Sequence, residues 1–311
     1  MATSDVRRIL VTGATGQQGG AVVRELLAHP PSFPHEILAL TRKSTSTSAQ
    51  KLAEKPNVKI IEGDLNHCPA IFEAAGGQDS IWAVFLITVP SMKKLKPGVE
   101  DAEVAQGKAM FNAAQANGVK HFVFSSVDRG GEEKSWSSPT RIPHFITKHE
   151  IELYIRDNIN TSQMSYTILR PVAFMDNYMP GVIGRIFAAA WAQMGTHKLQ
   201  LVATRDIGIF GAKALSDPEN EDFKNKPLAL AGDELTQAEG NEAMWRVKGR
   251  PMIQTYWFIA SFLKWMIADV GVMFRWFEEE GYGADIAKCR RINPDMLNFE
   301  TWLKDESRHT S

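Results

Sequence analysis

The stretch Ile9-Leu-Val-Thr-Gly-Ala-Thr-Gly-Gln-Gln-Gly-Gly20 carries an apolar strand directly into a glycine-rich turn and then into a helix. Its glycines Gly13, Gly16 and Gly19 follow a G-x-x-G-x-x-G spacing. In a strand-turn-helix unit, the first glycine permits the tight turn, the second lets backbone N–H groups approach a pyrophosphate, and the third lets the helix pack on the strand. Glycines that serve the turn conformation alone are the alternative, but the flanking strand and amphipathic helix favour a dinucleotide-binding turn.

We expect the pyrophosphate at the N-terminal end of the helix that begins near Gln17, where backbone N–H groups and the helix dipole favour an anion. The turn then supplies a first group of cofactor contacts, namely Gly13, Thr15, Gly16, Gln17, Gln18 and Gly19. On this interpretation Gly16→Val or Gly19→Val should abolish dinucleotide binding and leave the fold largely intact.

The composition is that of an ordinary globular chain with ample length for a large core. It has 311 residues, 44% hydrophobic and 23% charged, with a formal net charge of −1. A nearly neutral chain without a basic run is not expected to bind nucleic acid directly. Cys68 and Cys289 match neither a metal-ligand spacing nor a disulfide framework, so we expect no metal site and a reducing compartment.

No apolar leader precedes the first strand, and the apolar stretches 181–195 and 253–274 contain charged residues. Both stretches therefore resemble packed helices more than membrane spans. We expect a cytoplasmic protein without a membrane partner, and a nuclear location is left open.

Strand-like and helix-like segments alternate over the first 170 residues. Apolar runs at 9–11, 37–40, 58–61, 81–87, 121–125 and 166–169 alternate with helix-compatible segments at 17–28, 67–75, 99–117 and 143–158. This alternation predicts right-handed crossovers and an α/β fold, a doubly wound parallel sheet of the Rossmann type. We expect residues 1–170 to form this dinucleotide-binding domain.

The alternation of strand-like and helix-like segments ends after Pro171. Residues 171–311 predict a smaller, mostly helical lobe that binds a substrate or a partner. Strand candidates are 199–203 and 228–231, and aromatic helices are expected around 253–280. The polar and glycine-rich segments 44–48 and 128–141 predict mobile loops.

The second strand ends at Thr41-Arg42-Lys43, where an NAD-preferring site would place a carboxylate. Arg42 can instead form a bidentate contact with a 2′-phosphate, and Lys43 can add a second positive charge. A solvated turn is the alternative, because surface Arg-Lys pairs are common. The pattern favours NADP(H) over NAD(H).

Two further strand ends carry candidate cofactor contacts. Asp64 and Leu65 follow the third strand, where a carboxylate and a backbone N–H can receive the adenine edge, although Asp64 can equally be a helix N-cap. Thr88, Val89 and Pro90 follow the fourth strand, where the second ribose of the cofactor should pass.

The helix expected over 143–158 starts at a proline, which is favoured at the first helical position. His144 and Lys148 lie one turn apart on the same stripe of this helix, so Lys148 is expected to point at the site with His144 beside it. Phe174 follows the sixth strand and would face the nicotinamide, with a core position as the alternative.

Together these motifs resemble the NmrA-like family, a branch of the atypical short-chain dehydrogenases. The resemblance covers nearly the whole chain and is carried by the glycine turn at 13–19, Arg42, Gly63-Asp-Leu, Phe124-Ser-Ser, Lys148-His-Glu-Ile-Glu and Leu169-Arg-Pro-Val-Ala-Phe-Met-Asp-Asn. It implies NADP(H) binding, with Lys148 on the nicotinamide ribose. Family members include redox-sensing regulators as well as quinone and isoflavone reductases.

Active short-chain dehydrogenases carry a tyrosine four residues before the lysine, and this chain has His144 there. The resemblance therefore implies the binding role of Lys148 without the phenolic proton donor. His144 could replace the tyrosine as an acid, since histidine titrates near neutrality, or be merely structural. Two functions follow. The first is a cofactor-sensing regulator of a protein partner, with loop 128–141 and the C-terminal lobe ordered by the cofactor. The second is an NADPH-dependent reductase of a small apolar carbonyl, enone or quinone, with Lys148 and His144 as catalytic residues.

Overall fold

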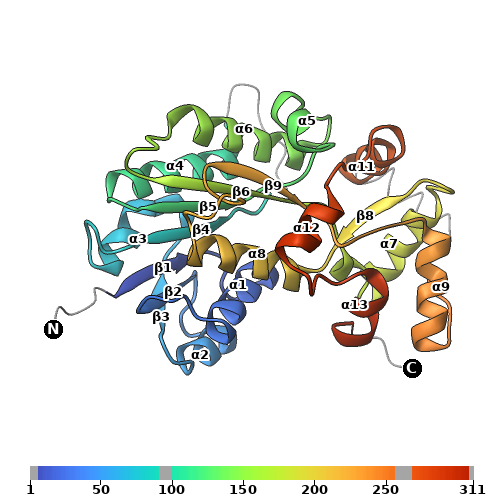
Figure 1. Cartoon of the computed structure of the whole chain (residues 1–311), viewed down its shortest axis with the longest axis horizontal. Coiled ribbons are helices and arrows are strands. Elements are labelled where there is room, and N and C mark those ends of the chain that lie inside the picture. Colours follow the sequence, from blue (N-terminus) through green and yellow to red (C-terminus); the bar gives the residue numbers. More distant parts are fainter. Residues whose placement is uncertain (1–5, 91–99, 256–267, 308–311) are drawn as a thin grey trace. The chain divides into compact units, whose positions relative to one another are not determined.

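The computed structural model describes residues 6–90, 100–255 and 268–307. Its main sheet has the strand order β3-β2-β1-β4-β5-β6-β9 (Figure 1). These strands are β1 Arg7–Val11, β2 His35–Thr41, β3 Val58–Glu62, β4 Ala83–Ile87, β5 His121–Ser125, β6 Ser165–Pro171 and β9 Lys226–Leu230. All pairings among β1 to β6 are parallel. The strand order reverses between β1 and β4, which confirms the predicted doubly wound fold.

Helices cover both faces of this sheet because its central strands are apolar on both sides. Helices α4 (Ala102–Ala116) and α6 (Pro143–Asn158) lie along one face, and α1 (Gln17–Ala28) and α8 (Thr204–Ser216) lie along the other (Figure 1). The shorter helices on this part of the chain are α2 Thr47–Ala53, η1 Leu65–His67 and α3 Cys68–Ala75.

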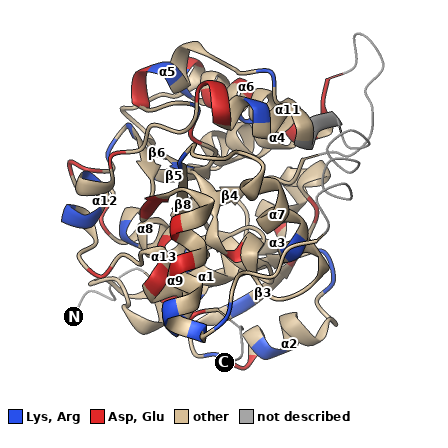
Figure 2. Ribbon diagram, turned by 90° about the vertical axis from the view of Figure 1, so that its right-hand side faces the viewer, with Lys and Arg blue, Asp and Glu red and all other residues tan. Residues whose placement is uncertain are grey.

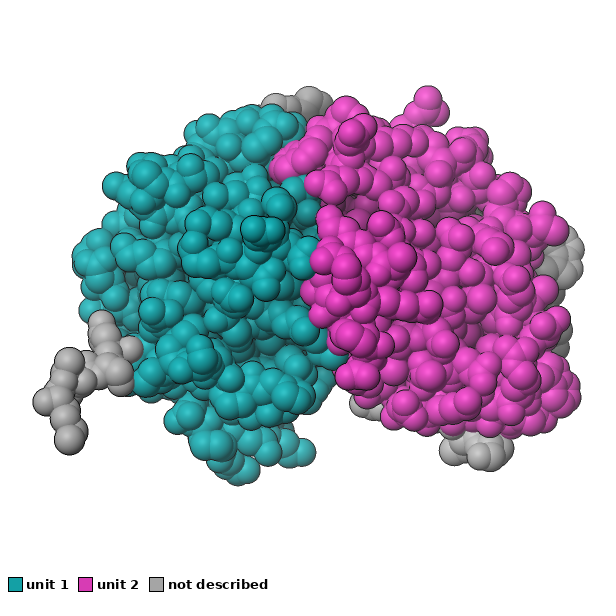
Figure 3. Space-filling view, viewed as in Figure 1, with its two compact units in different colours: residues 1–126, 147–169, 207–228 teal, residues 127–146, 170–206, 229–311 magenta. Residues whose placement is uncertain are grey.

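The chain divides into two compact units, coloured separately in Figure 3. The first comprises residues 1–126, 147–169 and 207–228, and the second comprises residues 127–146, 170–206 and 229–311. The boundary expected after residue 170 lies beside one of the points where the chain passes between units. The sequence did not indicate the other crossings.

The second unit contains a small sheet in the order β10-β8-β7 and mostly helical structure. Its strands are β7 Ala173–Phe174, β8 Leu199–Val202 and β10 Asp233–Leu235. Its helices are α5 Glu132–Ser137, η2 Met175–Tyr178, α7 Val182–Ala192, α9 Gln237–Lys248, α11 Ala268–Glu279, α12 Ile286–Ile292 and α13 Phe299–Asp305. A buried aromatic cluster that includes Trp191, Phe299 and Trp302 forms the core of this unit. Of the aromatic helices expected around 253–280, residues 256–267 lie outside the described residues.

The strand expected at 228–231 is confirmed as part of β9, but β9 is the edge strand of the main sheet, whereas it was expected in the C-terminal lobe. Two segments expected to be mobile loops each include part of a helix. Segment 128–141 contains α5, and the buried Asp128 carboxylate accepts the backbone N–H groups of Gly130, Gly131 and Gly283. Segment 44–48 leads into α2, whose first turn is capped by Ser46. Polar residues predicted to lie in mobile loops therefore serve as caps.

None of the helices in the described ranges is long and apolar enough to cross a membrane.

Candidate dinucleotide site

The glycine turn between β1 and α1 is closed by its own backbone. The N–H of Gly16 donates to the carbonyl oxygen of Gly13 at 2.8 Å, and Gly13 has a φ of +59°. A Cβ atom at Gly19 would lie 2.4 Å from that same oxygen, whereas one at Gly16 would lie 3.2 Å from it. Gly19 therefore allows the helix to pack on the turn, and Gly16 leaves open the space before the helix.

The N-terminus of α1 has the features of an anion site. Gly16 is its N-cap and offers no side-chain cap, and the first turn contains no acidic residue. Thr15, Gly16 and Gln17 are exposed. N–H groups at a helix start that lack side-chain acceptors suit a phosphate. The residues present therefore fit a pyrophosphate.

Two serines, Ser125 and Ser126, stand at the end of β5, and the first of them contacts the start of α1. Ser125 Oγ donates to Gln18 Oε1 at 2.7 Å, so the Gln18 side chain is tied to the sheet. Ser126 Oγ is buried and has no hydrogen-bond partner among the described residues. An unpartnered buried hydroxyl at the carboxyl end of a parallel strand is a further feature that fits a bound ligand.

Thr12 fixes the turn to the neighbouring strand and was missed in the sequence. Its Oγ1 accepts the N–H of Ile87 at 2.8 Å and donates to the carbonyl oxygen of Ile87 at 3.2 Å. Its position as the one polar residue between an apolar strand and Gly13 was the available signal. Thr12 thus sets the distance between the glycine turn and the end of β4.

The expected phosphate-binding cations are open to solvent. Arg42 and Lys43 follow β2 and are exposed, and Arg42 forms no ion pair with any described residue. Ser44 donates from its backbone N–H and its hydroxyl to the Glu62 carboxylate on β3. These hydrogen bonds lower the pKa of Glu62. Glu62, which was not predicted, therefore holds the turn in which Arg42 lies.

Asp64 caps a helix, although not the one expected to start near Pro69. Its Oδ1 accepts from the backbone N–H of Asn66 at 2.8 Å at the start of η1, whereas the N-cap of α3 is His67, which makes no side-chain cap. A contact of Asp64 or Leu65 with an adenine stays a prediction. Val89 and Pro90 are both exposed after β4, as a segment beside a cofactor would be.

Lys148 lies in a buried polar cluster with three other residues. Its Nζ is 2.9 Å from Glu103 Oε1 and 2.7 Å from Thr88 Oγ1. Thr147 Oγ1 donates to the second oxygen of Glu103 at 2.5 Å. Thr88 and Lys148 were both predicted for the site and are brought together, whereas Glu103 and Thr147 were missed because nothing in the sequence links α4 to α6.

Burial and pairing act in opposite directions on this cluster. Burial lowers the pKa of Lys148, and the neighbouring carboxylates of Glu103 and Glu152 oppose that effect. Burial raises the pKa of Glu103, but the Lys148 ammonium and the Thr147 and Thr88 hydroxyls outweigh it, so the pKa is lowered. At neutral pH Glu103 is therefore a carboxylate, and its charge favours the ammonium form of Lys148.

Two expected residues belong to the second unit. The half-buried His144 ring lies edge-on against Phe145 with centroids 4.8 Å apart, which is a packing contact. Phe174 lies in β7 and pairs with Val202 of β8. A catalytic role for His144 and a nicotinamide contact for Phe174 both stay predictions.

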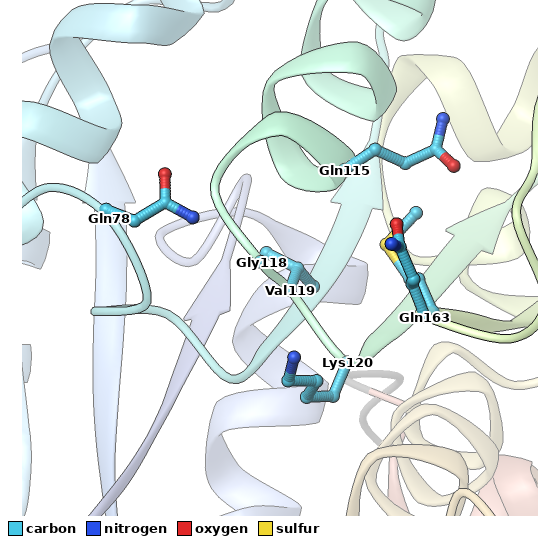
Figure 4. A pocket seen from close by; sticks show the side chains of 7 residues that line it. Gln78, Gln115, Gly118, Val119, Lys120 and Gln163 are labelled. Atoms are coloured by element: carbon cyan, nitrogen blue, oxygen red, sulfur yellow. The ribbon is translucent and has the colours of Figure 1, made fainter.

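Two cavities lie away from the residues discussed so far. One of about 240 Å³ is lined by Gln78, Gln115, Gly118, Val119, Lys120, Gln163 and Met164 (Figure 4). It borders the N-terminal end of β5, opposite the strand end that ligands use in such sheets. The amide of Gln115 is already bonded to the backbone of Asn158 and Asn160.

The second cavity, of about 300 Å³, lies beside α9 and α13, where acidic residues gather (Figure 2). Of its four carboxylates, that of Glu239 caps α9 and that of Glu300 pairs with Arg246 and Lys304. Within the described part of the chain, no three His, Cys, Asp or Glu residues are grouped so that they could hold a metal.

A doubly wound parallel sheet with a glycine turn at its switch point defines a Rossmann-type protein. The model of the NmrA-like family matches residues 5–303, so the chain belongs to the NmrA-like family. The chain is 26% identical to an NmrA-like family domain-containing protein of Dictyostelium discoideum, over 96% of this chain and 97% of that one. It is 30% identical to the NAD(P)H azoreductase of Xenophilus azovorans, over 78% and 75% of the two chains.

Solved structures show the same fold. NmrA, a negative transcriptional regulator, superposes with a TM-score of 0.70 at 16% identity, covering 97% of this chain and 96% of that one. Citrobacter sp. triphenylmethane reductase complexed with NADP(H) gives a TM-score of 0.70 at 20% identity, covering 96% and 99%. The fold is therefore shared by a regulator and by a reductase.

The geometry of the turn separates the effects expected for valine at Gly16 and at Gly19, both of which were expected to leave the fold intact. Gly16 has an extended backbone (φ −95°, ψ −171°) that valine readily adopts, so Gly16→Val should keep the fold and abolish NADP(H) binding. Gly19→Val should instead disrupt the turn itself, because its Cβ would meet the Gly13 backbone. Circular dichroism together with cofactor fluorescence measures both effects. A Gly16→Val protein that is folded and binds normally would contradict the site.

Proposed function

We propose that this chain binds NADP(H) and reports the redox state or supply of that cofactor to a protein partner, with little intrinsic dehydrogenase activity. Cofactor binding is proposed because α1 begins at a glycine turn and has no side-chain cap, so its first N–H groups are available for a pyrophosphate. The pyrophosphate would lie there, and the 2′-phosphate would meet Arg42 and Lys43. A relative of the same fold, NmrA, was solved in complex with NADP and with NAD.

Low turnover is proposed because the proton-donating residue is missing. When bound, NADP(H) supplies hydride chemistry, and a reductase of this fold needs a group that delivers a proton to the reduced substrate. No tyrosine stands four residues before Lys148, and the Lys148 ammonium is enclosed by Thr88 and Glu103. Lys148 therefore supports cofactor binding and is poorly placed as an acid.

Regulation requires that the cofactor favours one state of the protein that the partner recognises. A ligand shifts such an equilibrium only by its differential affinity for the two states. An effect of the cofactor on segment 128–141 stays a prediction, and α5 and the Asp128 hydrogen bonds are the contacts that such an effect would have to change.

A second candidate function is an NADPH-dependent reductase acting on a small apolar carbonyl, enone or quinone. The 30% identity to an NAD(P)H azoreductase favours it, as does the likeness in fold to an NADPH-dependent quinone oxidoreductase of Escherichia coli. In this case His144 would have to deliver the proton.

Turnover distinguishes the two functions. We expect purified protein to consume NADPH no faster than the uncatalysed reaction with quinones, azo dyes and aldehydes, since it lacks the donor. Absorbance at the NADPH band measures the rate. Steady consumption that is lost in both His144→Ala and Lys148→Ala would establish the reductase function instead.

A further inference from the structure

The Lys148 ammonium uses all three of its donors within the first unit. Its Nζ lies 2.9 Å from Glu103 Oε1, 3.0 Å from the carbonyl oxygen of Thr88 and 2.7 Å from Thr88 Oγ1. An ammonium group has three N–H donors and no acceptor. A ribose hydroxyl can therefore bind Lys148 only if one of these three contacts is exchanged.

The three contacts differ in how readily they can be given up. The Thr88 hydroxyl also donates to Glu103 Oε1 at 2.8 Å, so it keeps a partner if Lys148 moves away. Thr88 is followed by Val89, which is 75% exposed, so solvent or a ligand reaches this strand end. The Glu103 side chain is fully buried, and without Lys148 its charge would be uncompensated. The Thr88 contacts are thus the exchangeable ones.

The fold holds Glu103 in place for this contact. Glu103 lies in the first turn of α4, where its N–H is capped by Asp101 at 2.7 Å. One turn later the two helices approach so closely that a Cβ at Gly107 would lie 2.7 Å from Ile151 on α6. This approach fixes the distance between the start of α4 and Lys148.

We propose that Glu103 is the positioning residue for Lys148. Glu103 holds the ammonium charged and directed at the end of β4, and it is the contact that Lys148 keeps when a ribose hydroxyl of the cofactor replaces Thr88. This inference rests on the proposed NADP(H) binding.

The charges around Lys148 determine how the proposal depends on pH. Glu103 faces it from α4 and Glu152 lies on its own helix, while the Phe124 ring of β5 lies 5.4 Å away. Burial lowers the pKa of Lys148 and both carboxylates raise it. Removing the charge of Glu103 must lower the pKa further. The ammonium, and with it the attraction for the cofactor, is then lost as pH rises through that lower pKa.

The test is Glu103→Gln, which preserves the side-chain shape and removes the charge. Calorimetry gives the Kd for NADPH at several pH values between roughly 7 and 9.5. Above the pKa of Lys148, each further pH unit lowers the protonated fraction of this lysine about tenfold. Binding should weaken as pH rises at a lower pH in Glu103→Gln than in wild type, and each unit of difference between the two midpoints corresponds to about tenfold in the protonated fraction of Lys148. The matched control is Glu100→Gln, which removes an exposed charge near the start of α4 and should follow wild type.

A second readout does not need the cofactor. The Nζ resonance of Lys148 titrates in NMR spectra of the free protein, and its midpoint should be lower in Glu103→Gln than in wild type. If NADPH fails to bind wild type, the proposed function fails while this titration still tests the role of Glu103. An unchanged midpoint, or an unchanged pH profile of binding, would overturn the inference.

If Glu103→Gln does not fold, the double variant Glu103→Gln/Lys148→Gln removes both buried charges. It should fold, and bind NADPH more weakly than wild type with no dependence on pH over the same range. Binding equal to that of wild type would overturn the inference.

Discussion

Replacing Lys148 by methionine is expected to lower the free energy of unfolding by about 3–5 kcal/mol at pH 7, because the buried Glu103 carboxylate then loses its cationic partner and keeps only the Thr88 and Thr147 hydroxyls. In wild type the pKa of Glu103 is lowered, so the pair stabilises the fold above the ordinary carboxyl pKa and loses that contribution as pH falls. In Lys148→Met the burial of Glu103 raises its pKa. The difference between the two proteins should therefore shrink toward acid pH.

Urea unfolding at two pH values measures this effect, and the chain offers a matched control. Lys108 pairs with Glu100 at 2.6 Å, but both side chains are partly exposed. Lys108→Met should cost less than about 1 kcal/mol, which is usual for a surface pair. Equal losses in Lys108→Met and Lys148→Met would show that the buried cluster contributes no more than a surface ion pair.

Arg42→Ala is expected to weaken NADPH binding by about 1.5–3 kcal/mol, roughly 10- to 100-fold, which is the usual contribution of a charge-assisted hydrogen bond. Binding of NADH should be nearly unchanged, because NADH lacks the 2′-phosphate. Calorimetric titration of both cofactors gives the ratio. Lys51→Ala on α2 removes the same charge from another exposed position and controls for general electrostatics. Equal losses for NADPH and NADH would refute the assignment of Arg42.

The first half of the fold follows from local patterns that the structure preserves. Helix α1 (Gln17–Ala28) begins after Gly16 and ends before Pro30, and helix α6 (Pro143–Asn158) begins at its proline, as these signals predict. The buried centres of β1 (9–11) and β5 (122–124) are apolar runs, as expected for parallel strands covered on both faces. The glycine turn is equally local, and its geometry follows from the spacing of its glycines.

The remainder depends on contacts between distant segments. Whether β9 pairs with β6 or joins the small sheet is decided by tertiary packing, which short apolar runs do not reveal. Segment 128–141 is ordered by Gly283, 155 residues away from Asp128 in sequence. Glu103 resembles any other acidic residue in a first helical turn until the structure places it against Lys148. The sequence therefore predicts Thr88 and Lys148 for the site, but not the Glu103 carboxylate that pairs with Lys148.

The central claim, that this chain is an NADP(H)-binding protein, is tested most directly by calorimetric titration of the wild-type chain with NADPH and NADH at one pH and salt concentration. We expect saturable binding of one NADPH per chain, at least about tenfold tighter than NADH, since Arg42 is available for the 2′-phosphate. No binding of either cofactor would contradict the glycine-turn site, and equal affinity for the two would contradict the assignment of NADP(H).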